Sequence, residues 1–240
     1  MQNLFSRTER LIGKENIQKL QHTHVAIFGL GGVGGYALEA LARSGIGHFT
    51  LVDHDIFSTS NLNRQILATE ASLGQPKVLI AKERVQLINP AAEVEVRDCF
   101  FLPENAEEFD FSNYDFVVDA IDTVSGKIAL ILHSQQAGAK IISCMGCGNR
   151  FDPTKLRLGD IYETEMDPLA KIMRHELRKR HIRRCDVVFS MEKPTKPSEP
   201  IEENEKRSVP GSTAFVPSTA GLLIAYWVFE QITGVKAPTF

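Results

Sequence analysis

The order of apolar and polar positions along the chain predicts short buried strands that alternate with amphipathic helices. Short apolar runs are typical of strands in a buried sheet, and apolar residues three to four positions apart are typical of helices. One predicted strand, at 93–97, instead alternates apolar and charged residues. In the first part of the chain, the pattern predicts strands at 24–28, 48–53, 93–97, 114–119 and 140–143, and helices at 36–44, 77–88 and 125–137.

The first two strands, with a glycine-rich turn at 29–35 and a helix between them, form a strand–helix–strand unit. Such a unit joins parallel strands. We therefore expect an α/β fold with a Rossmann-like, doubly wound, mostly parallel sheet and helices on both faces.

The rhythm changes after Met145, where Gly146, Gly148 and Pro153 interrupt it. A smaller C-terminal α+β extension is expected there. The segment 193–211 contains four prolines among many charges, so it is too polar to build a core and is predicted to be a mobile loop. The remaining pattern predicts strands at 156–161 and 186–190, and helices at 168–180 and 218–233.

Composition limits the classes of protein that fit. The 240 residues, 43% of them hydrophobic, suit one large α/β domain or one domain with an appendage. The net charge of −3 means that any contact with nucleic acid must come from a local basic patch. No apolar window is as long as a membrane span, and the N-terminus lacks the apolar region of a secretory signal, so we expect a cytoplasmic protein without membrane contact.

The four cysteines include one C-x-x-C pair, Cys144 and Cys147. A structural zinc site needs a second pair of ligands, so zinc is not expected and reduced cytosolic thiols are favoured. Cys185 follows a basic run and resembles the nucleophile of some acyl-transfer enzymes, but an incidental cysteine is the preferred interpretation.

The glycine-rich turn carries the most specific chemical signal. It lies between a strand and a helix, as a nucleotide-binding fingerprint requires, and its glycines let the backbone approach phosphate closely. Asp53 follows the next strand and is placed to accept hydrogen bonds from ribose hydroxyls. The glycines predicted to bind the nucleotide are Gly29, Gly31, Gly32 and Gly34.

Polar residues after the second strand favour a triphosphate over a dinucleotide. Arg64 and Lys77 supply a guanidinium and an ammonium, the usual partners of phosphate, and Asn61 and Asn63 add neutral donors. The alternative for both cations is an exposed position in a loop. Asp55 could cap a turn or support the site indirectly.

Asp122 is the candidate magnesium ligand. It follows the strand that ends at Asp119, and magnesium prefers one or two carboxylates together with phosphate oxygens. Asp119 itself is expected to cap the next turn. The helix at 168–180 and the residues after it are strongly basic and are either a solvated face or a phosphate-backbone contact. The candidates for that contact are Arg174, Arg178, Lys179 and Arg183.

Taken together, these motifs resemble the ubiquitin-activating-enzyme-like adenylyltransferases over residues 7–143. The resemblance implies ATP and magnesium as cofactors, with a monovalent cation (sodium or potassium) also possible. It also implies a homodimer, in which Arg10 of an R-x-x-R motif reaches the partner subunit's triphosphate. The positions that match the family's ATP and magnesium residues are Gly32, Asp53, 60–64 (including Ser60), Lys77 and Asp122.

A closer resemblance, to the bacterial tRNA threonylcarbamoyladenosine dehydratases, extends into the C-terminal half through segments such as 152–154, 167–170 and 186–190. It implies that the threonine carboxylate of a modified tRNA adenosine is adenylated by ATP and then cyclised. Arg10, Arg64, Lys77 and Asp122 are the implied catalytic residues. The chain departs from this group in the glycine-rich run at 144–148 and in the loop at 193–211.

This interpretation divides the chain into an ATP-binding adenylation domain at 1–148 and a substrate-facing extension at 149–240, within one continuous fold. The main alternative is an activator of a ubiquitin-like sulfur-carrier protein, and a sulfur-transfer protein is a possible partner in either case. An NAD-dependent oxidoreductase and an inactive nucleotide-binding subunit are further alternatives.

Overall fold

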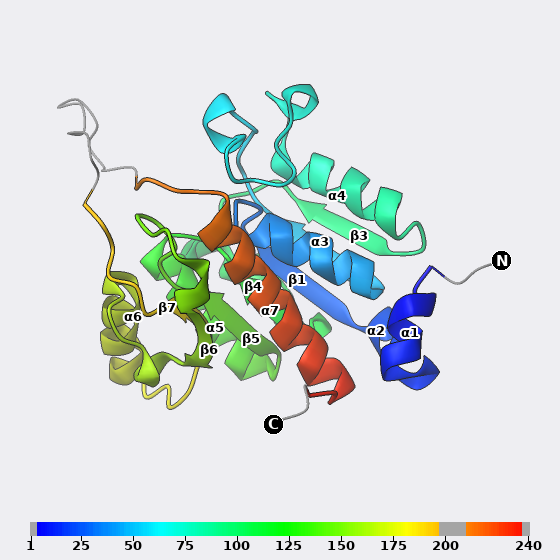
Figure 1. Cartoon of the computed structure of the whole chain (residues 1–240). Coiled ribbons are helices and arrows are strands. Elements are labelled where there is room, and N and C mark those ends of the chain that lie inside the picture. Colours follow the sequence, from blue (N-terminus) through cyan, green and yellow to red (C-terminus); the bar gives the residue numbers. More distant parts are fainter. Residues whose placement is uncertain (1–3, 197–209, 237–240) are drawn as a thin grey trace.

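The computed structural model describes residues 4–196 and 210–236. One sheet runs through the molecule in the order β3-β2-β1-β4-β5-β7-β6 (Figure 1). Neighbouring strands are parallel except β6 and β7, which pair antiparallel, so the predicted mostly parallel sheet is confirmed. The strands are β1 (His24–Phe28), β2 (His48–Val52), β3 (Glu93–Arg97), β4 (Phe116–Asp119), β5 (Lys140–Cys144), β6 (Leu156–Asp160) and β7 (Asp186–Ser190).

Helices cover both faces of the sheet, as the sequence predicts (Figure 1). One apolar cluster joins α2, α3, α4 and α7 to one face, and a second joins α5 and α6 to the other. The helices are α1 (Ser6–Ile12), α2 (Lys14–His22), α3 (Gly34–Ser44), α4 (Lys77–Ile88), α5 (Val124–Ala137), α6 (Pro168–Lys179) and α7 (Phe215–Thr233). None of these helices in the described ranges is long and apolar enough to cross a membrane.

Several predicted boundaries shift. The predicted turn at 29–35 overlaps α3, which begins at Gly34, and β4 begins at Phe116, two residues later than expected. The last predicted helix begins three residues early, at Phe215, because Pro217 falls in the first turn, where a missing N–H costs no hydrogen bond. The first two helices, α1 and α2, were not predicted.

The C-terminal residues share the sheet and core with the first half. Strand β7 pairs with β5, and α7 packs along α3 (Figure 1). A Cβ at Gly221 would lie 2.3 Å from the Val33 carbonyl oxygen, so α7 and the glycine-rich turn are in direct contact. The predicted boundary between 148 and 149 therefore falls within one sheet.

The predicted loop at 193–211 lies mostly outside the described residues, at 197–209. Its described ends meet at Asn149. The Thr195 N–H donates to the Asn149 carbonyl at 2.8 Å, and the Gly211 N–H donates to Asn149 Oδ1 at 2.7 Å.

Candidate active site

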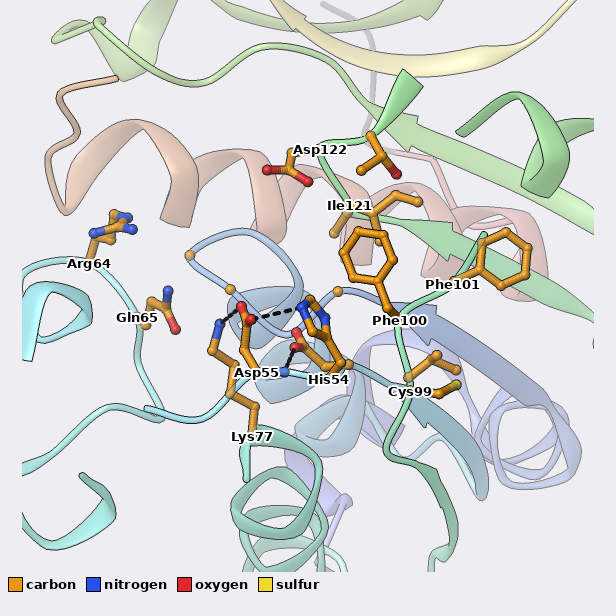
Figure 2. Close-up of a pocket in the computed structure, with 17 residues that line it drawn as sticks. His54, Asp55, Arg64, Gln65, Lys77, Cys99, Phe100, Phe101, Ile121 and Asp122 are labelled. Carbon is orange, nitrogen blue, oxygen red and sulfur yellow. Dashed lines mark hydrogen bonds and ion pairs between the residues drawn. The ribbon is translucent and has the colours of Figure 1, made fainter. Parts of the chain in front are cut away.

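A cavity of about 320 Å³ opens at the carboxyl ends of β1, β2, β3 and β4, which are neighbours in the sheet (Figure 2). Doubly wound sheets bind their ligands in this position. The predicted site residues that line the cavity are Gly29, Gly31, Gly32, Asp53, Arg64, Lys77 and Asp122. Those that do not line it are Arg10, Gly34, Ser60, Asn61 and Asn63.

The glycine-rich turn closes tightly over the end of β4. Gly29 has φ +91°, and a Cβ there would lie 2.6 Å from the Ala120 carbonyl oxygen. A Cβ at Gly34 would lie 1.8 Å from the Gly29 carbonyl oxygen, so both positions exclude other residues. Gly31 lines the cavity, and a Cβ there would lie 3.8 Å from Gln65 Nε2, an ordinary contact, so a phosphate can approach the backbone at this point.

Asp53 holds this turn against the end of β2. Its buried carboxylate accepts hydrogen bonds from the Leu30 N–H at 2.6 Å and from the Asp55 N–H at 2.9 Å. The carboxylate also lines the cavity. Binding of a ribose by Asp53 stays a prediction, and its contacts here are to the backbone of the site.

Lys77, the first residue of α4, places its ammonium in the cavity wall. The side chain is 5% exposed, and Nζ lies 2.8 Å from Asp55 Oδ2 (Figure 2). His54 Nε2 lies 3.2 Å from the other oxygen of the same carboxylate. Asp55 therefore holds Lys77 in place, which settles the choice between a turn cap and a supporting role in favour of the latter.

The polar segment 60–65 divides into structural and cavity-facing residues. Asn61 is buried, and its Oδ1 accepts from the Ser58 N–H, which closes a short helical turn. Asn63 donates through Nδ2 to the Ser212 carbonyl at 3.0 Å. Arg64 Nη1 donates to the Ser60 carbonyl at 2.8 Å and to Asn63 Oδ1 at 2.9 Å. Asn61 and Asn63 thus position the loop from which the Arg64 guanidinium reaches the cavity.

Asp122 lies across the cavity from Lys77, in the segment after β4 (Figure 2). Its exposed carboxylate makes no hydrogen bond or ion pair with the described residues. Ligand atoms of Asp53, His54 and Asp55 also lie within 4.8 Å of one another, as in a metal site. Because backbone N–H groups and Lys77 already occupy those two carboxylates, Asp122 fits magnesium better.

Asp119, the last residue of β4, belongs to a buried ionic cluster beneath the cavity. Its Oδ1 accepts from the Ile121 N–H at 3.3 Å, as expected for a capped turn. Its carboxylate also binds Lys127 Nζ at 3.0 Å and the Ser143 hydroxyl. Lys127 completes its contacts with the Cys144 carbonyl at 2.8 Å, so the cluster joins the ends of β4 and β5 to α5.

Several cavity residues were missed by the sequence prediction. Gln65 and Thr123 line the cavity, and each has one buried oxygen, Oε1 and Oγ1, without a hydrogen-bond partner among the described residues. In the sequence, Gln65 directly follows Arg64 and Thr123 directly follows Asp122, and this adjacency was the signal that could have identified them. The ring of Phe100 contacts His54 edge to face at 4.4 Å between centroids, and no pattern in the sequence indicated that contact.

Arg10 lies on α1, which packs on α2 near the amino end of β1 (Figure 1). The cavity lies at the carboxyl end of the same strand. Arg10 and the cavity of the same subunit are therefore at opposite edges of the sheet.

The four basic candidates on and after α6 differ in their contacts. Arg174 Nη1 donates to the Thr164 carbonyl at 2.8 Å, and Lys179 pairs with Glu176 at 2.9 Å. Arg178 lies over the Tyr162 ring at 5.1 Å, and both line a shallow hollow of about 370 Å³ together with Arg183. Lys179 is exposed as well, but only Arg178 and Arg183 among the four candidates line this hollow.

All four cysteines are free thiols. Cys185 is buried, and desolvation raises the pKa of its thiol far above the ordinary value, which argues against a nucleophile there. The Sγ atoms of Cys144 and Cys147 lie 3.6 Å apart. No second pair of thiols or histidines joins them in the described ranges.

Comparison with known proteins covers the whole described chain. The profile of the ThiF family matches residues 5–240. The chain is 42% identical to the tRNA threonylcarbamoyladenosine dehydratase of Bacillus subtilis, over 93% of this chain and 92% of that protein. Its structure superposes on the E. coli tRNA N6-threonylcarbamoyladenosine dehydratase in complex with ATP, with a TM-score of 0.87, 33% identity, and coverage of 96% and 93%. The complex of that protein with AMP gives the same TM-score.

The similarity to sulfur-carrier enzymes is shorter. A sulfur carrier protein adenylyltransferase of Thermus thermophilus is 39% identical over 111 residues, which is 46% of this chain and 41% of that protein.

Proposed function

Because this chain belongs to the ThiF family, we propose that it is an ATP-dependent tRNA threonylcarbamoyladenosine dehydratase. The observation that carries the proposal is the likeness along nearly the full length of both chains to the dehydratase complexes with ATP and AMP. The cavity agrees with it, since glycine backbone, an arginine, a buried lysine and a free carboxylate face one another there. These groups suit a triphosphate and leave little purpose for a nicotinamide.

The reaction begins when the threonine carboxylate of the modified tRNA attacks the α-phosphorus of ATP. The bond to the β-phosphate oxygen breaks, pyrophosphate leaves, and an acyl-adenylate forms. Negative charge builds on the phosphate oxygens in this step. We assign its stabilisation to Arg64 and Lys77, which face the cavity from the same side as the glycine-rich turn.

In the second step the carbamoyl group attacks the activated carbonyl of the same nucleoside. A five-membered ring closes and AMP leaves. Because attack is intramolecular, correct positioning replaces a covalent enzyme intermediate. This agrees with the burial of Cys185 and with the raised pKa of its thiol.

We expect Asp122 to hold magnesium together with phosphate oxygens, and magnesium there would offset phosphate charge. Asp55 and His54 keep Lys77 oriented toward the same space. A sodium or potassium site remains a prediction from the resemblance alone.

We further propose a homodimer in which Arg10 completes the partner subunit's site. The observation behind this is the position of Arg10 at the opposite edge of its own sheet. Only a second copy can bring this guanidinium to a cavity.

The tRNA is expected to contact the basic face of α6. Arg178 and Arg183 border the hollow beside Tyr162, and an aromatic ring next to cations suits a nucleic acid strand. We expect the enzyme to work in the cytoplasm, with tRNA as its substrate.

The second candidate function is activation of a sulfur-carrier protein by adenylation of its C-terminal carboxylate. It is favoured by shorter similarities, such as that to the Thermus enzyme, which covers less than half of each chain. A sulfur-transfer protein that docks on the dehydratase itself remains possible under either function.

The decisive experiment is ATP–pyrophosphate exchange with tRNA that carries threonylcarbamoyladenosine, with unmodified tRNA as the control. We expect exchange with the modified tRNA alone, together with the loss of one water from its nucleoside by mass spectrometry. Exchange that requires a carrier protein ending in Gly-Gly, and not tRNA, would overturn the dehydratase proposal in favour of the second candidate.

A further inference from the structure

The loop that follows β5 holds two thiols in contact. Cys144 is the last residue of β5, and Cys147 lies three residues on. Their Sγ atoms are 3.6 Å apart, and a disulfide bond measures about 2.05 Å. Small rotations of the two side chains close that difference. A structural zinc site does not account for the pair, because the described residues contain no second pair of ligands beside it.

Contacts on both sides fix the backbone of this loop. The Cys144 carbonyl accepts from the buried Lys127 ammonium at 2.8 Å. The Gly146 N–H donates to Asp167 Oδ2 at 3.0 Å, and Asp167 also caps α6. The two sulfur atoms are therefore held near each other by two separate buried anchors rather than by chance approach of a flexible loop.

A buried cation lies beside the pair. The Arg150 side chain is fully buried and binds Asp167 through Nη1 at 3.2 Å, while its Nε and Nη2 have no hydrogen-bond partner within 4–196 and 210–236. Hydrogen bonding from the Cys144 thiol and the nearby Arg150 charge hold the pKa of Cys147 below its ordinary value. The same hydrogen bond and burial raise the pKa of Cys144. Cys147 is also the more exposed of the two thiols.

We propose that Cys144 and Cys147 form a redox-active dithiol that is converted to a disulfide by small-molecule disulfides such as glutathione disulfide. Cys147 is the attacking thiol, because it is the more accessible, and Cys144 is the resolving thiol. This proposal concerns the thiols themselves and does not depend on the proposed function.

The exchange proceeds in two steps. The Cys147 thiolate attacks one sulfur of the small disulfide, the bond between its sulfurs breaks, and the departing thiolate takes up a proton. The Cys144 sulfur then releases its proton and attacks the Cys147 sulfur in the mixed disulfide, which expels the second small thiol. The protein loses two electrons and two protons, and the small disulfide gains both. An excess of small thiol reverses the sequence.

The test exposes the folded full-length protein to buffers of increasing glutathione disulfide over glutathione and maps its thiols by alkylation and peptide mass spectrometry. We expect the loss of two of the four thiols, a Cys144–Cys147 disulfide without retained glutathione, and full recovery with excess glutathione. If both thiols persist in excess glutathione disulfide, or if wild-type protein accumulates glutathione on Cys147, the proposal is wrong.

Single variants test the order of attack. Cys144→Ser should trap a stable glutathione adduct on Cys147, and Cys147→Ser should leave Cys144 unmodified. A Cys99→Ser/Cys185→Ser double variant is the matched control and should oxidise like the wild type. Modification of Cys144 in the Cys147→Ser protein would overturn the assignment. If a variant does not fold, the peptide map of the wild-type protein still decides whether the disulfide forms.

Discussion

At the scale of single residues, the charged groups around the cavity differ in how far the chain itself neutralises them. Lys77 is paired with Asp55, and Asp53 is bound by two backbone N–H groups. Arg64 binds only a carbonyl and an amide oxygen, and Asp122 has no partner among the described residues. The charges of Arg64 and Asp122 are therefore not neutralised by ion pairs with the described residues and are available to a ligand.

Replacing Asp122 by asparagine should slow pyrophosphate exchange by roughly 100-fold or more, since a group that stabilises charge in the transition state is typically worth that much. The magnesium concentration needed for half-maximal exchange should rise as well. Glu107→Gln, an exposed acid away from the cavity, is the control and should change neither value. Normal exchange and normal magnesium dependence in Asp122→Asn would rule out the metal assignment.

Residue types could be predicted from the sequence more readily than residue partners. The residues at 60–64 were predicted to bind the nucleotide, and of these Arg64 lines the cavity. Asn61 and Asn63 instead bind backbone groups, one of them on Ser212, about 150 positions later. Contacts between such distant segments depend on the tertiary fold, and a local pattern carries no information about them.

At the scale of elements, two ionic clusters connect helices to strands and to one another. The first is the buried Lys127–Asp119 pair, whose two side chains are both fully buried between α5, β4 and β5. Removing one member of such a pair leaves an uncompensated charge in the interior.

Lys127→Met should therefore lower the free energy of unfolding by about 3–5 kcal/mol, measured by urea denaturation. The double variant Lys127→Met/Asp119→Leu should recover most of that loss, because no unpaired charge remains. A loss below about 0.5 kcal/mol in the single variant, the size of an ordinary surface change, would contradict this account.

The second cluster joins α3 to α4 through Glu39. Its carboxylate binds Arg84 at 2.8 and 2.9 Å and Arg43 at 2.7 Å. Burial raises the pKa of Glu39, but the hydrogen bonds from Arg84 and Arg43 outweigh it, so the pKa lies below the ordinary value of 4.5. A lowered pKa means that the ionised carboxylate favours the folded state.

The stabilisation by Glu39 should be complete above pH 4.5 and should be lost as the pH falls through the lower folded-state value. Glu39→Gln should cost about 2 kcal/mol near neutral pH, the scale of a charged hydrogen bond, and the difference from wild type should narrow in acid. Urea denaturation across pH measures it, with the exposed Glu83→Gln on α4 as control. If the difference in unfolding free energy between wild type and Glu39→Gln stays constant with pH, the ionised Glu39 carboxylate does not stabilise the fold in this way.

Elements with a strong apolar period could be predicted from the sequence, and those without one could not. Strand β3 was predicted from its alternation, and its residues are alternately exposed and half-buried at the edge of the sheet. Helix α1 buries none of its residues, so it has no apolar stripe to detect. Helix α7 begins at Phe215, three residues before its predicted start, and its first turn contains Pro217, which a first turn tolerates.

At the scale of the whole molecule, the carboxyl and amino ends of the central strands carry different parts of the proposed active site. The cavity lies at the carboxyl ends of β1 to β4, and Arg10 lies on α1 near the opposite edge. One subunit therefore contributes its cavity and its arginine to two separate sites in the proposed dimer.

This arrangement predicts complementation between inactive subunits. Arg10→Ala and Asp122→Asn should each lose activity, and an equal mixture after subunit exchange should regain about a quarter of wild-type activity, because half of the dimers are mixed and each has one intact site. Pyrophosphate exchange measures the recovery. A mixture of the two variants whose subunit exchange has been blocked by prior cross-linking serves as the control and should restore nothing. Failure of the freely exchanging mixture to recover would refute action of Arg10 across the interface.

The contact between α7 and the glycine-rich turn has a consequence for folding during synthesis of the chain. Residues 29–34 are synthesised long before α7, the helix that packs on them with Gly221 against Val33. During translation, the apolar face of the nascent strand–turn–helix unit therefore stays uncovered until α7 has been synthesised. The glycine-rich turn is therefore packed on both sides only after α7 has left the ribosome, so a chain that stalls or is truncated before α7 would lack this support.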